Sequence, residues 1–238
     1  EPLAWPAFLK NGRVDGVLVA GHPPIEFCAK LREQNIPSVI FADSIERTGC
    51  FCVRPDPTDG TIQAVRHLLS LGHRKIALVS SSRDYFTVDQ RYKAFCFAML
   101  DGGFQADPSL LVFDQKPTIS GGRAGVISLL KRGEMPSAIV FINDYMCLGG
   151  MMELMKRGIS LPEEVSVVGH DNSDFCMELE PTLSSVDMAF QSLVDEAIYL
   201  LHVQLDGGFN APMERIMKSK FIERASIASA QNSPLSLR

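Results

Sequence analysis

Short apolar runs rich in β-branched residues alternate along the chain with segments whose apolar positions recur at helical spacing. This alternation is typical of parallel sheets joined by crossover helices, and it predicts an α/β fold. The predicted strands span residues 14–20, 39–42, 75–80, 110–113, 138–142, 165–168, 184–186 and 216–222. The predicted helices span residues 25–34, 59–71, 88–100, 119–132, 144–157 and 190–205.

Both ends of the chain depart from this rhythm. Residues 1–10 have the pattern of the second half of a helix, whereas a doubly wound domain normally begins with a buried strand. We therefore expect either an unusual start or elements that precede this sequence. The segment 229–238 is rich in Ser, Ala, Asn and Pro, and we expect it to be a frayed tail.

Size and charge narrow the class of protein. The 238 residues, of which 46% are hydrophobic and 21% charged, suit one or two globular domains. No apolar stretch approaches the roughly 20 residues that a membrane helix needs, and no basic-then-apolar leader opens the sequence, which predicts a cytoplasmic protein without a membrane partner. The net charge of −5 argues against this chain binding nucleic acid by itself through a broad basic face.

The six cysteines stand mostly among apolar neighbours, without the paired spacing of a zinc knuckle. We expect reduced core thiols. Cys50 and Cys52 would share one face of a strand, which leaves a metal or redox site open, although no second pair or nearby histidine completes it. No metal or cofactor is predicted.

The common sequence motifs of enzymes are absent, including the dinucleotide, Walker and nucleophile-elbow patterns. None of the five histidines has a recognisable spacing to a nucleophile. Gly121, Gly122 and Gly125 open a predicted helix after a strand, but their spacing favours a glycine-permitted turn over a phosphate cradle. We therefore predict a protein without catalytic residues.

Polar side chains follow several predicted strands directly. Asp43 follows the strand 39–42, Asn143 and Asp144 follow 138–142, and Asp171 follows 165–168 after two residues. In open α/β sheets ligands bind beyond the carboxyl ends of the strands, so these groups would converge on one crevice. The alternative is that each one only caps the next helix, and this holds most strongly for Asp144.

Four segments carry a family resemblance. They are Gly72-His73-Arg74-Lys75-Ile76-Ala77, then Asn143-Asp144 followed by Gly149, then Gly158-Ile159 with Leu161-Pro162-Glu163-Glu164-Val165-Ser166-Val167-Val168-Gly169-His170-Asp171, and finally Pro181-Thr182-Leu183-Ser184-Ser185-Val186. Their order and spacing closely resemble the LacI/GalR family of bacterial transcription regulators over residues 13–226.

The resemblance implies a ligand-sensing domain with two periplasmic-binding-protein-like lobes, each a parallel sheet flanked by helices. The expected N-terminal lobe comprises residues 1–54 and 188–210, and the expected C-terminal lobe 55–187 and 211–228, followed by the tail. By comparison with the family, the first strand, helix and second strand of the N-terminal lobe and the operator-binding helix-turn-helix are absent. The resemblance also implies a small effector, such as a sugar, and a homodimer.

The resemblance also assigns effector-binding residues. Asp43 matches a carboxylate of the N-terminal lobe, Arg91 matches the ligand-binding arginine of an Arg-x-x-Gly-Phe motif, and Asn143 and Asp171 match an amide and a carboxylate that bind sugar hydroxyls or a purine base. Ala94 replaces the glycine of that motif. For Arg91, the residues alone leave open a surface ion pair with Asp89 or a helix neighbour.

Other positions leave the identity of the ligand open. Gln115 lies near a position where members of the family often place a stacking aromatic, and Met188 stands where others place a polar contact. Tyr85 and Phe86 either line the cleft or merely pack on it. Two other functions remain: a transport-type sugar-binding protein of the same fold and a flavodoxin-like hydrolase, for which no nucleophile and base are found.

Overall fold

The computed structural model describes residues 5–10, 12–21, 23–41, 45–133, 135–208 and 213–230. The chain forms two compact units. Unit 1 comprises Glu1–Asp56 and Ala189–Lys218, and unit 2 comprises Pro57–Met188 and Ser219–Arg238. The chain therefore passes between the units three times, after residues 56, 188 and 218.

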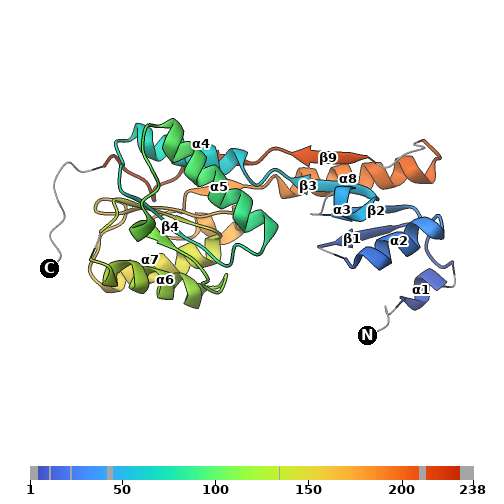
Figure 1. The fold of residues 1–238 in the computed structure, drawn as a ribbon, viewed down its shortest axis with the longest axis horizontal. Coiled ribbons are helices and arrows are strands. Elements are labelled where there is room, and N and C mark those ends of the chain that lie inside the picture. The colour runs from blue at the N-terminus through green and yellow to red at the C-terminus, as the bar shows by residue number, and fades with distance from the viewer. Residues whose placement is uncertain are drawn as a thin grey trace. The chain divides into compact units, whose positions relative to one another are not determined.

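Unit 1 is built on a parallel sheet (Figure 1). Its strands are β1 (Val17–Ala20), β2 (Ser38–Phe41), β3 (Phe51–Pro55) and β9 (Glu214–Met217), in that spatial order. Its helices are α1 (Ala7–Lys10), α2 (Ile25–Glu33), α3 (Ile45–Thr48) and α8 (Phe190–Leu205). Alternate strand residues face opposite layers, so Ile40 packs with Leu31 of α2 while Val39 packs with Leu200 of α8.

Unit 2 contains a second parallel sheet, with spatial order β5-β4-β6-β7. Its strands are β4 (Ile76–Val79), β5 (Leu111–Val112), β6 (Ala138–Phe141) and β7 (Ser166–Val168). Helices α4 (Asp59–Ser70) and α5 (Phe86–Asp101) cover one face, and α6 (Ile119–Lys131) and α7 (Asp144–Lys156) cover the other (Figure 1). The predicted α/β class, with helix-flanked parallel sheets, is confirmed.

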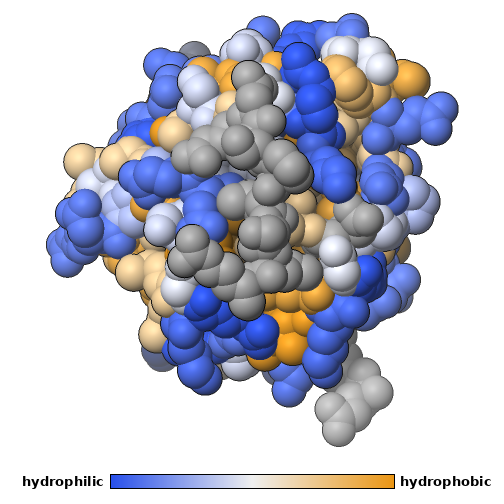
Figure 2. All heavy atoms as spheres, turned by 90° about the vertical axis from the view of Figure 1, so that its left-hand side faces the viewer, coloured by the Kyte–Doolittle hydropathy of each residue, from blue (hydrophilic) through white to orange (hydrophobic). Residues whose placement is uncertain are grey.

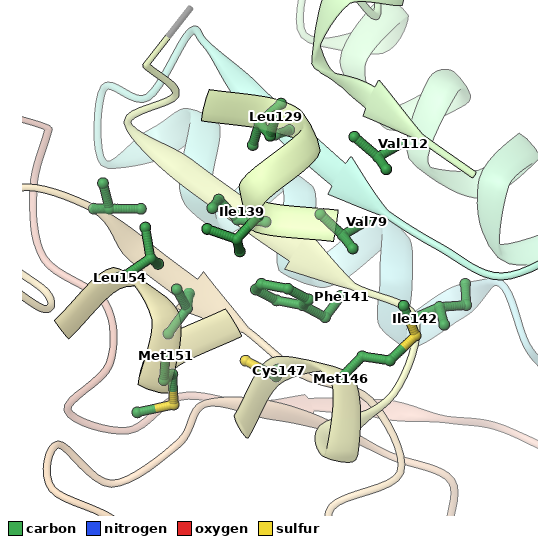
Figure 3. Close-up of a cluster of buried hydrophobic side chains, with 14 of the residues drawn as sticks. Val79, Val112, Leu129, Ile139, Phe141, Ile142, Met146, Cys147, Met151 and Leu154 are labelled. Atoms are coloured by element: carbon green, nitrogen blue, oxygen red, sulfur yellow. The ribbon is translucent and has the colours of Figure 1, made fainter. Parts of the chain in front are cut away.

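The alternation of side chains divides the core of unit 2 into two layers. Leu78 and Val140 face α4 and α5, whereas Val79, Ile139 and Phe141 face α6 and α7 (Figure 3). Because both faces of the sheet are buried, its strands are continuously apolar instead of alternating with polar residues. This explains why short apolar runs identified them in the sequence.

Glycines bring α6 and α7 unusually close. A Cβ atom on Gly122 would overlap the backbone carbonyl of Met146, and one on Gly149 would overlap that of Ile119. A Cβ on Gly125 would overlap the side chain of Val79. These contacts show that the glycine group at the start of α6 serves packing between elements, so the predicted glycine turn and the alternative phosphate cradle are both wrong.

The C-terminal part of unit 2 runs along the edge of its sheet. Strand β8 (Ser185–Asp187) pairs antiparallel with β10 (Lys220–Ile222), and the segment after β10 bonds to β7 through Val167 N and Ser226 O at 2.9 Å. His73 is buried beneath this segment and donates from Nε2 to the Ala228 carbonyl at 2.9 Å. His73 thus completes the turn before β4, as its position in the sequence suggests.

Several predicted elements need correction. The expected strand at 216–222 is two strands, β9 in unit 1 and β10 in unit 2, so residues 213–217 do not belong with the C-terminal lobe. β3 was expected only as the strand that would place Cys50 and Cys52 on one face, without bounds, and α3 was not predicted. The strand expected at 110–113 shortens to β5 after a 3-10 turn, Pro108–Leu110, since Asp107 and Pro108 favour a turn.

Two further features are the polarity of the surface and the state of the cysteine thiols. The face drawn in Figure 2 is mainly hydrophilic, with apolar side chains gathered in limited areas. None of the six cysteines forms a disulfide, and all except Cys96 are buried. In the part of the chain that the structure describes, no helix has the length and apolar character for crossing a bilayer, and no group of three or more His, Cys, Asp or Glu could hold a metal ion.

The close approach of α6 and α7 predicts that Gly149→Ala destabilises the protein by about 1–3 kcal/mol, because the clash with a backbone carbonyl outweighs the better helix propensity of alanine. Ala124→Leu, which adds volume at an exposed position of α6, should leave stability within about 0.5 kcal/mol. Urea unfolding measures both changes. A Gly149→Ala variant as stable as the parent would contradict the packing described above.

The buried imidazole of His73 predicts a pH dependence of stability. Burial lowers its pKa from 6.5, although the bond to Ala228 opposes the shift. Because the unfolded chain then binds a proton that the folded chain does not, the free energy of unfolding should decrease as the pH falls below about 6.5. His73→Gln, which keeps a donor but does not titrate, should show a shallower decrease between about pH 7 and 5. Equal slopes in parent and variant would refute this.

Candidate functional site

The order of the strands in unit 2 reverses direction at β4, which sets apart one place along the carboxyl edge of the sheet. From β4 the chain crosses to β5 on one side, and it later reaches β6 on the other side of β4. Helix α5 follows β4 on one face of the sheet and helix α7 follows β6 on the other, so the carboxyl ends of β4 and β6 form a topological switch point. Such an edge is where open α/β sheets bind ligands.

Arg91 lies on α5 and reaches across this edge. Its Nη1 donates to the Ile142 carbonyl at 2.6 Å, just beyond β6, and its Nη2 donates to Asp171 Oδ1 at 3.3 Å, beyond β7. The side chain is only 13% exposed. Burial lowers the pKa of the guanidinium, while the carboxylates of Asp171 and Asp144 oppose that shift. Arg91 therefore remains a cation held between two strand ends.

Asp171 occupies a loop with unusual backbone geometry. Its φ is 106°, and the φ of Asn172 is 53°, both in the region that residues with a side chain rarely adopt. The Asp171 amide donates to the Val186 carbonyl of β8 at 2.9 Å. Burial raises the pKa of Asp171, but His170 and Arg91 outweigh this effect, so the net shift is downward. Asp171 therefore presents an ionised acceptor beside Arg91.

His170 also contacts the carboxylate of Asp171. Its Nδ1 lies 3.3 Å from Asp171 Oδ1, and because an ionised carboxylate only accepts, Nδ1 must carry the proton. Burial and the neighbouring Arg91 lower the pKa of His170 to about 4, although Asp171 opposes this. The imidazole is therefore neutral at physiological pH.

Three buried polar atoms near this edge have no hydrogen-bond partner among the described residues. They are Ser80 Oγ, which follows β4, Arg91 Nε on α5, and His170 Nε2, which follows β7. Buried polar atoms without partners are uncommon, and they are typical of sites that take up water or a ligand. The three atoms come from different elements that meet at one edge of the sheet.

Asn143 and Asp144 have different roles, helix capping and support of neighbouring segments, which the sequence alone does not distinguish. Asn143 caps α7, because its Oδ1 accepts from Met146 N at 2.8 Å, and its Nδ2 donates to the Pro117 carbonyl at 3.3 Å. Asn143 keeps one N–H and one lone pair for a ligand. Asp144 is fully buried and does not cap the helix; its carboxylate accepts from Ser185 Oγ at 2.6 Å and from Ser173 N at 2.7 Å.

The remaining candidates lie less deeply in the structure. Tyr85 and Phe86, at the start of α5, are 63% and 58% exposed, so neither packs into the core. Gln115 follows β5, and its Nε2 donates to the Phe113 carbonyl at 3.0 Å. Asp43 lies outside the described residues.

The alternative ion pair between Arg91 and Asp89 is wrong. Asp89 instead pairs with Arg83 at 2.7 Å and with Lys93 at 2.6 Å. Arg83 also stacks on the ring of Tyr92, with its guanidinium carbon 4.2 Å from the ring centroid. These contacts connect the loop after β4 to α5. Asp89 is therefore already paired, and Arg91 bonds to Asp171 instead.

Neither His170 nor Ser185 was predicted to be part of this site. His170 had a visible signal, since it stands next to Asp171 directly after a strand. Ser185 had none, because its contact with Asp144 spans 41 residues of sequence and depends on how β8 docks.

Comparison with known proteins gives consistent results. A family model described as a periplasmic binding protein-like domain matches residues 65–227. The HTH-type transcriptional regulator AscG of Escherichia coli (strain K12) is 30% identical over 225 residues, which cover 94% of this chain and 62% of AscG. The chain thus spans less than two thirds of the length of that relative.

Solved structures of regulators are similar as well. A sugar-binding transcriptional regulator of the LacI family from Escherichia coli, complexed with phosphate, has a TM-score of 0.82 at 28% identity, covering 93% of this chain and 80% of that one. A LacI family transcriptional regulator from Enterococcus faecium, with bound ribose, has a TM-score of 0.82 at 25% identity, covering 94% and 84%. The family model covers more than half of the residues of this chain. This chain therefore belongs to the periplasmic binding protein-like family, in the form found in LacI-family transcription regulators.

Proposed function

We propose that this chain is the effector-binding domain of a LacI-type transcription regulator and that it binds a small uncharged sugar or related polyol. The observation that carries this proposal is the pairing of the largely buried Arg91 with the half-exposed carboxylate of Asp171 at the switch point of unit 2. A planar group of donors next to an ionised acceptor suits the alternating donors and acceptors of sugar hydroxyls.

The charges of the site favour an uncharged ligand. Arg91 and Asp171 offset each other, His170 is neutral, and Arg91 already uses N–H groups on Ile142 and Asp171. A phosphorylated sugar would bring further negative charge toward the Asp171 carboxylate, and the guanidinium of Arg91 is already paired with that carboxylate. The ribose bound by the Enterococcus faecium relative supports a sugar-sized ligand.

The connection of the site to unit 1 offers a route for regulation. The loop of Asp171 bonds to Val186 of β8, and the chain leaves unit 2 after residue 188. A ligand that binds one arrangement of the two units more tightly than another would shift their equilibrium. In the whole regulator this shift would alter operator binding by a separate DNA-binding domain in the cytoplasm. Asp43 of unit 1 remains a predicted contributor to the effector site, with Asn143, Gln115, Tyr85 and Phe86.

The outer surface of α7 supports a homodimer. Tyr145, Met152 and Met155 recur at helical spacing on α7 and are 52%, 42% and 52% exposed. Exposed apolar stripes of this kind mark interfaces, and a two-fold dimer buries them against the same stripe of its mate. Helix α2 carries a further exposed apolar residue, Ile25.

The first test is calorimetric titration of the full-length regulator with D-ribose, other neutral sugars and their phosphates. For a neutral sugar that binds, Arg91→Ala and Asp171→Ala should each weaken affinity about ten- to a hundredfold, which corresponds to about 1.5–3 kcal/mol. Arg91→Lys should not restore it, because an ammonium cannot reproduce the planar donor group.

Arg66→Ala is the matched control, because it removes an arginine that pairs with an aspartate, Asp101, on the exposed surface of α4 and α5. Its affinity should equal that of the parent. Folded Arg91→Ala and Asp171→Ala variants that bind as tightly as the parent would show that the site lies elsewhere.

The second test concerns assembly. Replacing Met152 and Met155 together with Glu should convert the dimer into monomers at tens of micromolar, because four buried charges would face one another across the two-fold axis. Leu100→Glu, at a residue of α5 that is 66% exposed and outside this surface, is the control and should leave the dimer intact. Sedimentation velocity distinguishes the two, and an unchanged dimer in the double variant would exclude α7 as the interface.

A further inference from the structure

Asp144 has more hydrogen bonds than its place in α7 requires. Asn143 already caps the helix, yet the buried Asp144 carboxylate bonds to two other segments, Ser173 N in the loop after β7 and Ser185 Oγ on β8. The Asp144 amide also donates to the His170 carbonyl at 2.8 Å. All of these bonds converge on the loop that carries Asp171.

The loop needs such support because its conformation is unfavourable. Positive φ angles at Asp171 and Asn172 persist only where the surroundings hold them. Three successive amides are held in place: Asp171 N by the Val186 carbonyl, Asn172 N by Ser185 Oγ at 3.1 Å, and Ser173 N by Asp144 Oδ2. Asp144 provides the third bond directly.

Asp144 also stabilises the second of these bonds through Ser185. The Ser185 hydroxyl has one proton, which it donates to Asp144 Oδ1, and this orientation leaves its lone pairs available to the Asn172 amide. Ser185 is fully buried, so no solvent can replace Asp144 as the acceptor. Two of the three bonds made by the backbone amides of the loop therefore depend on one carboxylate, while the side chain of Asn172 also accepts from Arg224 Nη2 at 2.7 Å.

Gly169 provides the space for this arrangement. A Cβ atom at position 169 would overlap Asp144 Oδ1. The glycine between β7 and His170 thus lets the carboxylate of one strand-to-helix connection approach the backbone of the next.

We propose that Asp144 is a positioning residue for effector binding: it holds the loop 171–173 so that the Asp171 carboxylate meets Arg91 and faces the ligand. This inference rests on the proposed function for its consequence in binding. Its structural part, the dependence of the loop on Asp144, does not require any ligand.

The proposal predicts a difference between two substitutions. Asparagine can keep the bond from Ser173 N through its Oδ1, and its Nδ2 can donate to one lone pair of Ser185 Oγ, which reverses that bond but leaves the other lone pair to the Asn172 amide. Alanine removes both. If Asp144 acts by geometry, Asp144→Asn should behave like the parent, whereas a role based on its charge near Arg91 would make Asp144→Asn as defective as Asp144→Ala.

The ligand-free test is hydrogen exchange of the full chain, resolved to residues 171–173. Asp144→Ala should accelerate exchange of these amides at least tenfold, Asp144→Asn should change it less than threefold, and the amides of β4 and β6 should be unaffected in both. Ser185→Ala, which keeps the carboxylate, should accelerate exchange at Asn172 and provides the decisive variant if Asp144→Ala fails to fold. Unchanged exchange of residues 171–173 in Asp144→Ala, or of Asn172 in Ser185→Ala, would overturn the proposal.

The binding test is a double-mutant cycle with D-ribose and the neutral sugar panel. Asp144→Ala should weaken affinity at least tenfold in the parent but less than twofold in an Asp171→Ala background, because Asp144 acts through Asp171. Equal losses in both backgrounds would show a merely structural role and refute the proposal. If no sugar binds the parent, the proposed function fails, while the exchange experiment still decides the role of Asp144.

Discussion

The parallel alignment of β4, β6 and β7 is the constraint on which the rest of this site depends. Parallel strands end at the same edge of a sheet, and the pairing of Val79 with Phe141 and of Val140 with Val168 brings three strand ends together. A single side chain from α5, Arg91, can then bond to the carbonyl after one strand and the carboxylate after another. The chemistry of the site follows from this register.

Burial of charge explains the bonding of Arg91 and Asp144. A buried guanidinium or carboxylate is costly unless it is paired, so each of them has several partners within the protein. Arg91 bonds to the Ile142 carbonyl and the Asp171 carboxylate, and Asp144 bonds to Ser173 N and Ser185 Oγ. The same bonds that offset the desolvation of Asp144 therefore also hold an unfavourable backbone conformation next to the proposed ligand.

Strand β8 connects the loop of Asp171 to the chain crossings between the two units. This strand provides Ser185 to Asp144 and the Val186 carbonyl to Asp171, and it pairs with β10 on its other side. The chain passes from β8 into unit 1 and from unit 1 back into β10, so both paired strands lie directly beside crossings between the units. A conformational change in the loop of Asp171 would therefore act on residues next to two of the three crossings between the units.

Local pattern in the sequence determined the α/β class and most strands and helices, and family resemblance singled out Arg91 and Asp171 as predicted effector-binding residues. Apolar runs and helical spacing are properties of short segments, so one sequence suffices to identify them. Only the tertiary structure decided that Phe51–Pro55 is a central strand, because its pairing comes from β2 and from β9, which lies over 150 residues later. It also decided that Asn143 caps α7 while Asp144 supports the loop of Asp171, since both are acceptors after a strand and only the docking of β8 distinguishes them.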